Sequence, residues 1–162
     1  LLGVAAPDFR GLAACIAGAL YHHQVSLRQA HLFSAAKYHL ALDFFHLGVD
    51  KSIPRALTRV VCDAVQRQLY IAAADAESLP ALQGTFHLDG NTTGGYCLRY
   101  ETTSDSSGVL YAVTCKLFHY LGASIHGLSA FTSRGSTFVT VHLTLPSDRS
   151  LEEARQIVEH DF

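Results

Sequence analysis

The 162-residue sequence predicts an α+β protein with two similar halves, each an antiparallel sheet that carries its helices on one face. Three observations lead to this prediction. Short segments recur at a nearly constant offset, the spacing of apolar residues alternates between that of strands and that of helices, and polar stretches with glycine or proline separate the periodic segments. Since 49% of the residues are apolar and 16% are charged, the chain can form a sizeable core.

The repeat is seen in three pairs of short segments. Residues 8–12 match residues 105–109, residues 20–22 match residues 117–119, and residues 25–27 match residues 123–125. The first two pairs are 97 residues apart and the third pair is 98 apart, so one turn is a residue longer in the second half. An offset of this length indicates two copies of a domain of about 70–80 residues rather than a solenoid.

The first half is expected to begin with a short strand and to alternate from there. The predicted elements are a strand at 1–5, a helix at 9–23, strands at 26–33 and 38–47, and a second helix from residue 53 onward. In that second helix Ile53, Leu57, Val61 and Ala64 share a face. Pro54 falls in its first turn, where a missing N–H costs nothing.

The second half repeats this order. The predicted elements are a strand at 96–102, a helix at 106–121, strands at 124–131 and 136–145, and a last helix that Ser150 caps. The helix has an apolar residue at every fourth position from Val109 to Leu121. In the last strand, Val139, Val141 and Leu143 alternate with polar residues, which is typical of a half-buried strand.

The resulting order is β-α-β-β-α-β, the split βαβ or ferredoxin-like arrangement, in which both helices cover one face of a four-stranded antiparallel sheet. The predicted domains are residues 1–72 and 95–162, with a linker at 73–83 that contains Pro80. Residues 84–89 are expected to supply the fourth strand of the first domain, while the second copy stops at Phe162 before a fourth strand.

The alignment of the two halves also predicts which side chains of the third strand face the helices. An offset of 97 aligns Leu42 and Phe44 with Val139 and Val141 under the helices, and aligns Asp43 with Thr140 on the open face. An offset of 98 would bury Asp43 instead. Because a buried unpaired carboxylate is costly, the offset of 97 is expected in this strand.

Three short motifs resemble those of the ACT domain family. Residues 8–33 open with D-F-R-G-L and residues 105–131 with D-S-S-G-V, similar to the family's D-x-P-G-L loop before its first helix, and each motif is followed by a second strand. Leu42-Asp43-Phe44-Phe45 is similar to the L-D-x-F of the family's third strand. The tandem order most resembles the C-terminal regulatory pair of bifunctional PII uridylyltransferases/uridylyl-removing enzymes.

The resemblance implies a ligand site between the glycine loop of one domain and the second strand of its partner domain. Free N–H groups and the helix dipole at the helix start favour a carboxylate, a glycine lets a ligand approach the backbone, and the aspartate can accept an ammonium group. The implied ligand is an amino acid, with glutamine indicated by the family. The candidate residues are Asp8, Arg10, Gly11, Leu12, Ser26, Leu27, Asp105, Ser107, Gly108, Val109, Ser124 and Ile125.

The same residues also allow a reading without a ligand. Asp8 and Asp105 can cap their helices, and the glycines can serve close helix–sheet packing. Arg10 and Ser107 replace the family's proline, and Ser26 and Ser124 replace its asparagine. The alternative hypothesis is therefore an ACT pair that only dimerises or couples domains, with the free sheet faces packed on each other or on a second chain.

No catalytic or metal-binding motif is recognised. The sequence has no G-x-S-x-G, P-loop or HExxH motif, and residues 90–95 form a polar turn between strands. The ten histidines are expected to be solvated or hydrogen-bonded, and a metal site is the less favoured alternative. The fragment is expected to be non-catalytic and to need no cofactor. The resemblance implies that its parent chain is a nucleotidyltransferase, and an independent enzyme ranks last among the hypotheses.

Charge and cysteine content predict the partners and the compartment. The net charge is −2 and the pI is about 6.6, which argues against nucleic-acid binding. No apolar run of membrane-spanning length and no secretory leader is seen.

Cys15, Cys62, Cys97 and Cys115 lack C-x-x-C spacing and are expected to be reduced thiols in the cytoplasm. The chain begins at Leu1 and has no methionine, so it is expected to be a fragment of a longer protein. The ACT resemblance implies upstream catalytic domains as partners, together with a second ACT domain in the chain or in a homodimer.

Overall fold

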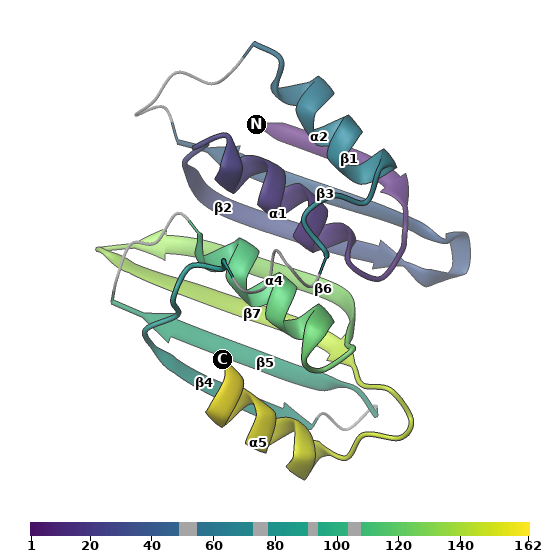
Figure 1. Cartoon of the computed structure of the whole chain (residues 1–162), viewed down its shortest axis with the longest axis vertical. Helices are drawn as coiled ribbons and strands as arrows, with labels where there is room; N and C mark the ends of the chain where they lie inside the picture. The colour runs from purple at the N-terminus through teal and green to yellow at the C-terminus, as the bar shows by residue number, and fades with distance from the viewer. Residues whose placement is uncertain (49–54, 73–77, 91–93, 104–107) are drawn as a thin grey trace.

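The structure is a computed structural model that describes residues 1–48, 55–72, 78–90, 94–103 and 108–162 (Figure 1). In the first half it contains β1 (Leu2–Pro7), α1 (Leu12–His22), β2 (Leu27–Ala35), the 3-10 turn η1 (Ala36–Tyr38), β3 (Leu40–Leu47) and α2 (Leu57–Gln66). In the second half it contains β4 (Thr85–Gly90), β5 (Tyr96–Thr102), α4 (Val109–His119), β6 (Ser124–Ser133), β7 (Ser136–Thr144) and α5 (Leu151–Asp161).

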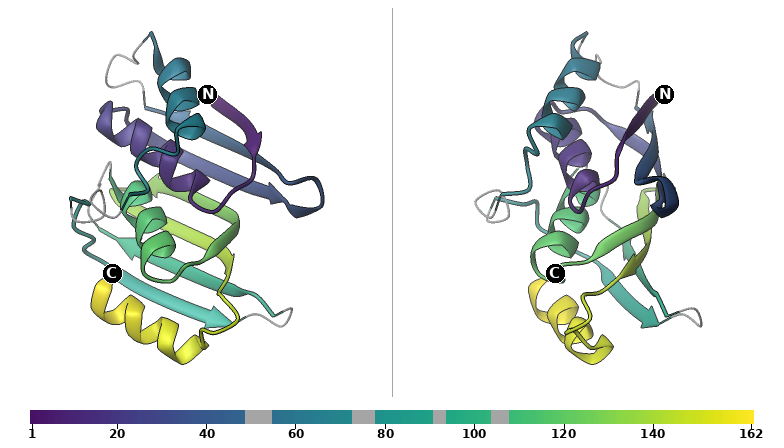
Figure 2. Two further views of the ribbon diagram at one scale, coloured as in Figure 1. Left: turned by 45° about the vertical axis from the view of Figure 1, so that its right-hand side comes forward. Right: turned by 90° about the vertical axis from the view of Figure 1, so that its right-hand side faces the viewer.

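The seven strands of the described residues form one antiparallel sheet in the order β1-β3-β2-β6-β7-β5-β4. The four α-helices of the described residues lie on one face of this sheet, and Figure 2 shows the other face uncovered. The predicted α+β class with an antiparallel sheet is therefore confirmed. The expected separate sheets, however, are joined into one, because β2 pairs with β6 from Gln29↔Phe131 to Phe33↔Gly127.

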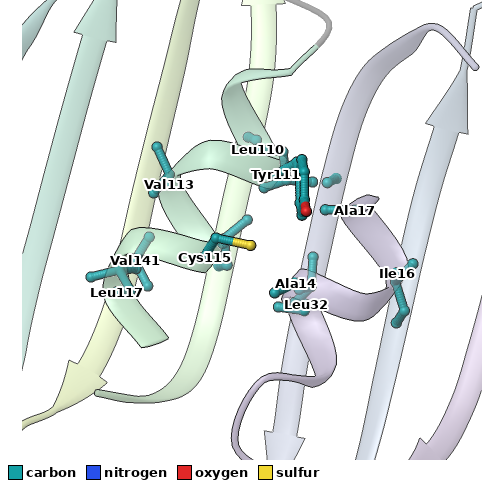
Figure 3. Close-up of a cluster of buried hydrophobic side chains, with 14 of the residues drawn as sticks. Ala14, Ile16, Ala17, Leu32, Leu110, Tyr111, Val113, Cys115, Leu117 and Val141 are labelled. Carbon is teal, nitrogen blue, oxygen red and sulfur yellow. The ribbon is translucent and has the colours of Figure 1, made fainter. Parts of the chain in front are cut away.

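The core is continuous across this junction. Helices α1 and α4 lie side by side, with Ala14 and Ala17 of α1 facing Tyr111 and Cys115 of α4 (Figure 3). These four side chains are all buried. The small alanine side chains allow the two helices to approach closely, so apolar side chains from both halves belong to the same buried cluster.

The predicted facing of the third strand was wrong. In β3 the residues Ala41, Asp43 and Phe45 are buried beneath the helices, whereas Leu42 and Phe44 are exposed on the open face. An offset of 98, which carries positions 41, 43 and 45 onto the buried positions 139, 141 and 143 of β7, matches this facing. Both second strands contain a register irregularity, between Leu27 and Gln29 and between Ile125 and Gly127. Such local shifts make an offset taken from one strand unreliable in the next.

The fourth strand forms, but next to the other half. We expected residues 84–89 to complete the first domain; instead β4 pairs with β5 from Thr85↔Glu101 to Gly90↔Tyr96 and ends the sheet on the far side. Helix α5 packs on β4. At the opposite edge no described strand pairs with the outer side of β1, and an apolar groove of about 330 Å³ separates β1 from α2.

Several local predictions hold within the described residues. Leu57, Val61 and Ala64 form the buried face of α2, while Ile53 and Pro54 lie outside the described part of the chain. Ser150 caps α5: the Glu153 amide donates to Ser150 Oγ at 3.2 Å, and the Ser150 amide donates to the Glu153 carboxylate at 2.9 Å. This reciprocal arrangement is a capping box.

Candidate functional site

A pocket of about 160 Å³ lies at the junction of the two halves. One buried water requires about 10–15 Å³, so this pocket has room for a small organic molecule. Its walls come from the loop before α1, the first turn of α1, the inner sides of β2 and β3, and the α4–β6 region. Six of the residues predicted from the sequence line it, namely Asp8, Arg10, Gly11, Leu12, Ser124 and Ile125.

Gly11 starts α1 in a left-handed conformation. Its φ is 103°, a backbone conformation that residues with a side chain rarely adopt. A Cβ at this position would lie 3.2 Å from Ile71 and 3.4 Å from Phe118, so the glycine also lets the two halves approach. No side chain caps α1 in the described structure. The amide groups of its first turn therefore present a partial positive charge at the pocket.

Asp8 does not cap α1. Its carboxylate instead accepts a hydrogen bond from Ser34 Oγ, and its backbone amide donates to the His39 carbonyl at 2.9 Å. These contacts hold Asp8 against the ends of β2 and β3, beside the pocket that it lines. Its carboxylate is thus fixed in place by the sheet rather than used by the helix.

Arg10 connects the loop of the first half to the second half. Its Nη1 donates to the Gly122 carbonyl at 3.4 Å, and its guanidinium carbon lies 5.6 Å from the centre of the Phe118 ring. This distance is in the range of a cation–π contact. Arg10 therefore places a positive charge at the pocket, on the residue that replaces the proline of the resembled family.

Asp43 lines the same pocket and was not among the candidate residues. Its side chain is only 2% exposed. Burial raises the pKa of this carboxyl from its usual 3.8 to about 7; a hydrogen bond with the Phe33 backbone opposes the shift, and the negative charge of Asp8 adds to it. The signal in the sequence for this position is the 98-residue offset, which places Asp43 beneath the helices.

The equivalent position in the second half is largely filled. Leu27 of β2 and Val109 of α4 do come together, but around a hollow of only about 30 Å³. A Cβ on Gly108 would lie 2.3 Å from Pro80 and 2.9 Å from Tyr21, so this helix start is covered by packing. The φ of Gly108 is −99°, which needs no glycine.

Of the remaining candidates, the structure describes only Ser26, which does not lie at this second position. The Ser26 carbonyl accepts the Gly48 amide at 2.8 Å, and Ser26 lines neither hollow. Asp105 and Ser107 lie outside the described residues. The structure therefore assembles one open pocket from the first glycine loop and the second strand of the other half.

The structure shows no disulfide bond among the four cysteines. Cys15 and Cys115 are buried, and burial raises the pKa of the Cys15 thiol to about 11.

In the parts of the chain that the structure describes, no three His, Cys, Asp or Glu side chains gather as a metal site. Within the same parts, every helix is too short or too polar to cross a membrane.

Comparison of the chain with protein-family models, with curated proteins and with solved structures finds no match.

Proposed function

We propose that the chain is a pair of ferredoxin-like, ACT-type repeats that senses an amino acid and regulates catalytic domains attached to it. The observation that best supports this is the pocket itself, where the loop at residues 8–12 of one half faces Ser124 and Ile125 of the other. The family resemblance favours glutamine as the ligand and a PII uridylyltransferase-like nucleotidyltransferase as the attached enzyme, in the cytoplasm.

The chemistry of the pocket fits a small zwitterion. A carboxylate is favoured at the uncapped start of α1, with Arg10 beside it, because both carry positive charge. An ammonium group is favoured at the carboxylate of Asp8. The Phe118 ring supplies an apolar wall for the ligand's side chain.

Such a ligand would act by stabilising the junction between the halves. It would touch the first half through residues 8–12 and the second half through the start of β6. A ligand shifts a conformational equilibrium only when it binds one state more tightly than the other. Here it would favour the state in which both walls of the pocket are in place, and the attached catalytic domains would respond to that state.

The test is calorimetric titration of the chain with the common amino acids at millimolar concentration, using variants at two glycines. Gly11 and Gly135 both have positive φ, so Gly11→Ala and Gly135→Ala strain the backbone in the same way. Of these two glycines, Gly11 lines the pocket and Gly135 does not, and Gly135 has open space around it. We expect glutamine binding that Gly11→Ala weakens and Gly135→Ala does not. An absence of heat with every amino acid would overturn the proposal.

A second candidate is an interaction module without a ligand. The open face of the sheet carries exposed apolar side chains, and this favours a partner surface. These residues are Phe33, Leu40, Leu42, Phe44 and Phe131. A dimer that forms to the same extent with and without amino acids, measured by analytical ultracentrifugation, would favour this candidate over the sensor.

A further inference from the structure

Asp43 is a buried carboxyl group on the otherwise apolar inner side of β3. Its inward-facing neighbours on β3, Ala41 and Phe45, are buried and apolar. The inward-facing positions of the related strand β7 that pack in the core are Val139, Val141 and Leu143, and none of them is charged. A buried carboxylate is costly unless it is paired. Side chains with strongly perturbed environments in clefts are candidates for function.

The charged groups around Asp43 leave it without a cationic partner. Among the described residues that line the pocket, the other titratable side chains are Asp8, Arg10 and His126. Asp8 is negative and accepts from Ser34, while Arg10 is engaged by Gly122 and Phe118. His126 lies 3.0 Å from Thr144 Oγ1 through its Nε2. The side chains that β2, α1 and α4 contribute to the pocket are uncharged, and the charged group that perturbs Asp43 is the negative Asp8.

We propose that the pocket holds the ammonium group of its ligand against Asp43, with Asp8 beside it, so that the ligand must carry an amine. This inference rests on the proposed function, since it assumes that the pocket is the ligand site. It adds Asp43 as the residue that selects amines: the ligand's ammonium replaces the missing cation, and the carboxylate is left for Arg10 and the start of α1. An ammonium–carboxylate contact of this kind is a charge-assisted hydrogen bond.

Binding of the ligand's ammonium group would then release a proton from the Asp43 carboxyl. Burial raises the pKa of Asp43 to about 7, so at pH 6 the free protein holds this carboxyl mostly protonated. An ammonium ligand favours the ionised form, so the carboxyl would lose its proton to the buffer while the ligand keeps its own protons. Affinity for the amine would increase between pH 6 and pH 8.

The experiment compares two ligands on three proteins by calorimetry at pH 6 and pH 8. The ligands are glutamine and glutaramate, which is glutamine without its α-amine. The proteins are the wild type, Asp43→Asn, which keeps the shape of the side chain and removes its charge, and Asp148→Asn as an exposed control. Thermal unfolding verifies that all three are folded. At pH 6, titrations in phosphate and in imidazole measure proton release from the difference in ionisation enthalpy of the buffers.

We expect Asp43→Asn to bind glutamine about 10-fold or more weakly at pH 8 and to lose the proton release, with Asp148→Asn like the wild type. The wild type should bind glutaramate far more weakly than glutamine. If glutamine binds the wild type and Asp43→Asn equally, or if glutaramate binds as well as glutamine, the role of Asp43 is refuted and the sensor proposal stands. If no amino acid binds the wild type, the sensor proposal itself fails.

Discussion

Tyr70 packs directly on Gly18, in the middle of α1. A Cβ built on Gly18 would lie 2.5 Å from the Cβ of Tyr70 and 3.0 Å from the ring of Tyr111. The Tyr111 hydroxyl donates to the Tyr70 carbonyl at 3.4 Å, and Tyr70 has a positive φ of 67°. The segment that follows α2 therefore packs against α1 and α4, the two central helices. It does so at Gly18, the one position of α1 that has no side chain.

Replacing this glycine should destabilise the protein although alanine is the better helix former. Gly18→Ala gains about 1 kcal/mol in helix propensity, but the new methyl overlaps Tyr70, and overpacking of this kind costs about 1–3 kcal/mol or more. We expect a net loss in the free energy of unfolding, measured with urea. In a Tyr70→Gly background, which removes the Cβ that the new methyl would overlap, the same substitution should cost less, and an equal loss in both backgrounds would contradict the packing explanation.

Asp43 should make the stability of the protein depend on pH. Because the pKa of Asp43 is raised from 3.8 to about 7, the native state binds this proton between those pH values and the unfolded state does not. The stabilisation that this bound proton gives the native state is complete below pH 4 and is lost as the pH rises to about 7. The loss is about 1.4 kcal/mol for each unit of pKa shift, a few kcal/mol in all.

Urea unfolding of the wild type and of Asp43→Asn at pH 5 and pH 8 measures this effect. We expect Asp43→Asn to be relatively more stable at pH 8 than at pH 5 when each is compared with the wild type. Asp148→Asn, at an exposed aspartate, should show no such change. A difference between wild type and Asp43→Asn that is equal at both pH values would show that Asp43 is already ionised in the native state.

Arg10→Ala should affect ligand binding more than stability. Its contact with Gly122 is exposed, so its loss should reduce the free energy of unfolding by less than about 1 kcal/mol. Loss of a charge-assisted partner for the ligand carboxylate should weaken amino-acid binding by about 10-fold, as measured by calorimetry. Arg59→Ala, on the exposed side of α2, is the control. Unchanged affinity in Arg10→Ala would remove Arg10 from the binding site.

The capping box of α5 predicts a loss of stability in Ser150→Ala. Loss of an N-cap serine costs about 1 kcal/mol. The Ser150 backbone amide lowers the pKa of Glu153, so the stabilisation from this carboxylate is present at neutral pH and is lost as the pH falls through its lowered pKa. Glu152→Gln, in the same turn but outside the box, should change the free energy of unfolding much less. Equal effects of the two substitutions would argue against the box.

The sequence was sufficient to predict the elements whose apolar residues follow a regular period. The alternation of Val139, Val141 and Leu143 predicted β7, and Ser150 predicted the start of α5, because these signals are local. The pairing of β2 with β6 and of β4 with β5 could not be predicted this way, because it depends on contacts between distant segments.

The candidate site shows the same limit. The family resemblance led to Gly11 and Ser124, which do line one pocket. Asp43 was not predicted because a buried carboxylate is costly in a closed core, whereas Asp43 lies in a pocket, where such a cost is often accepted. Pro80, which covers Gly108, comes from the segment expected to be only a linker.

The two ends of the sheet differ in how they are protected, and this limits how chains can aggregate. At β4 the Leu88 carbonyl accepts a hydrogen bond from Arg155 of α5 at 2.9 Å, whereas β1 contains no charged residue and has no described strand along its outer side. Such an edge can recruit a strand from another molecule. If two chains met edge to edge through β1, each would use up its unprotected edge, so growth would stop at a closed pair instead of continuing into a fibre.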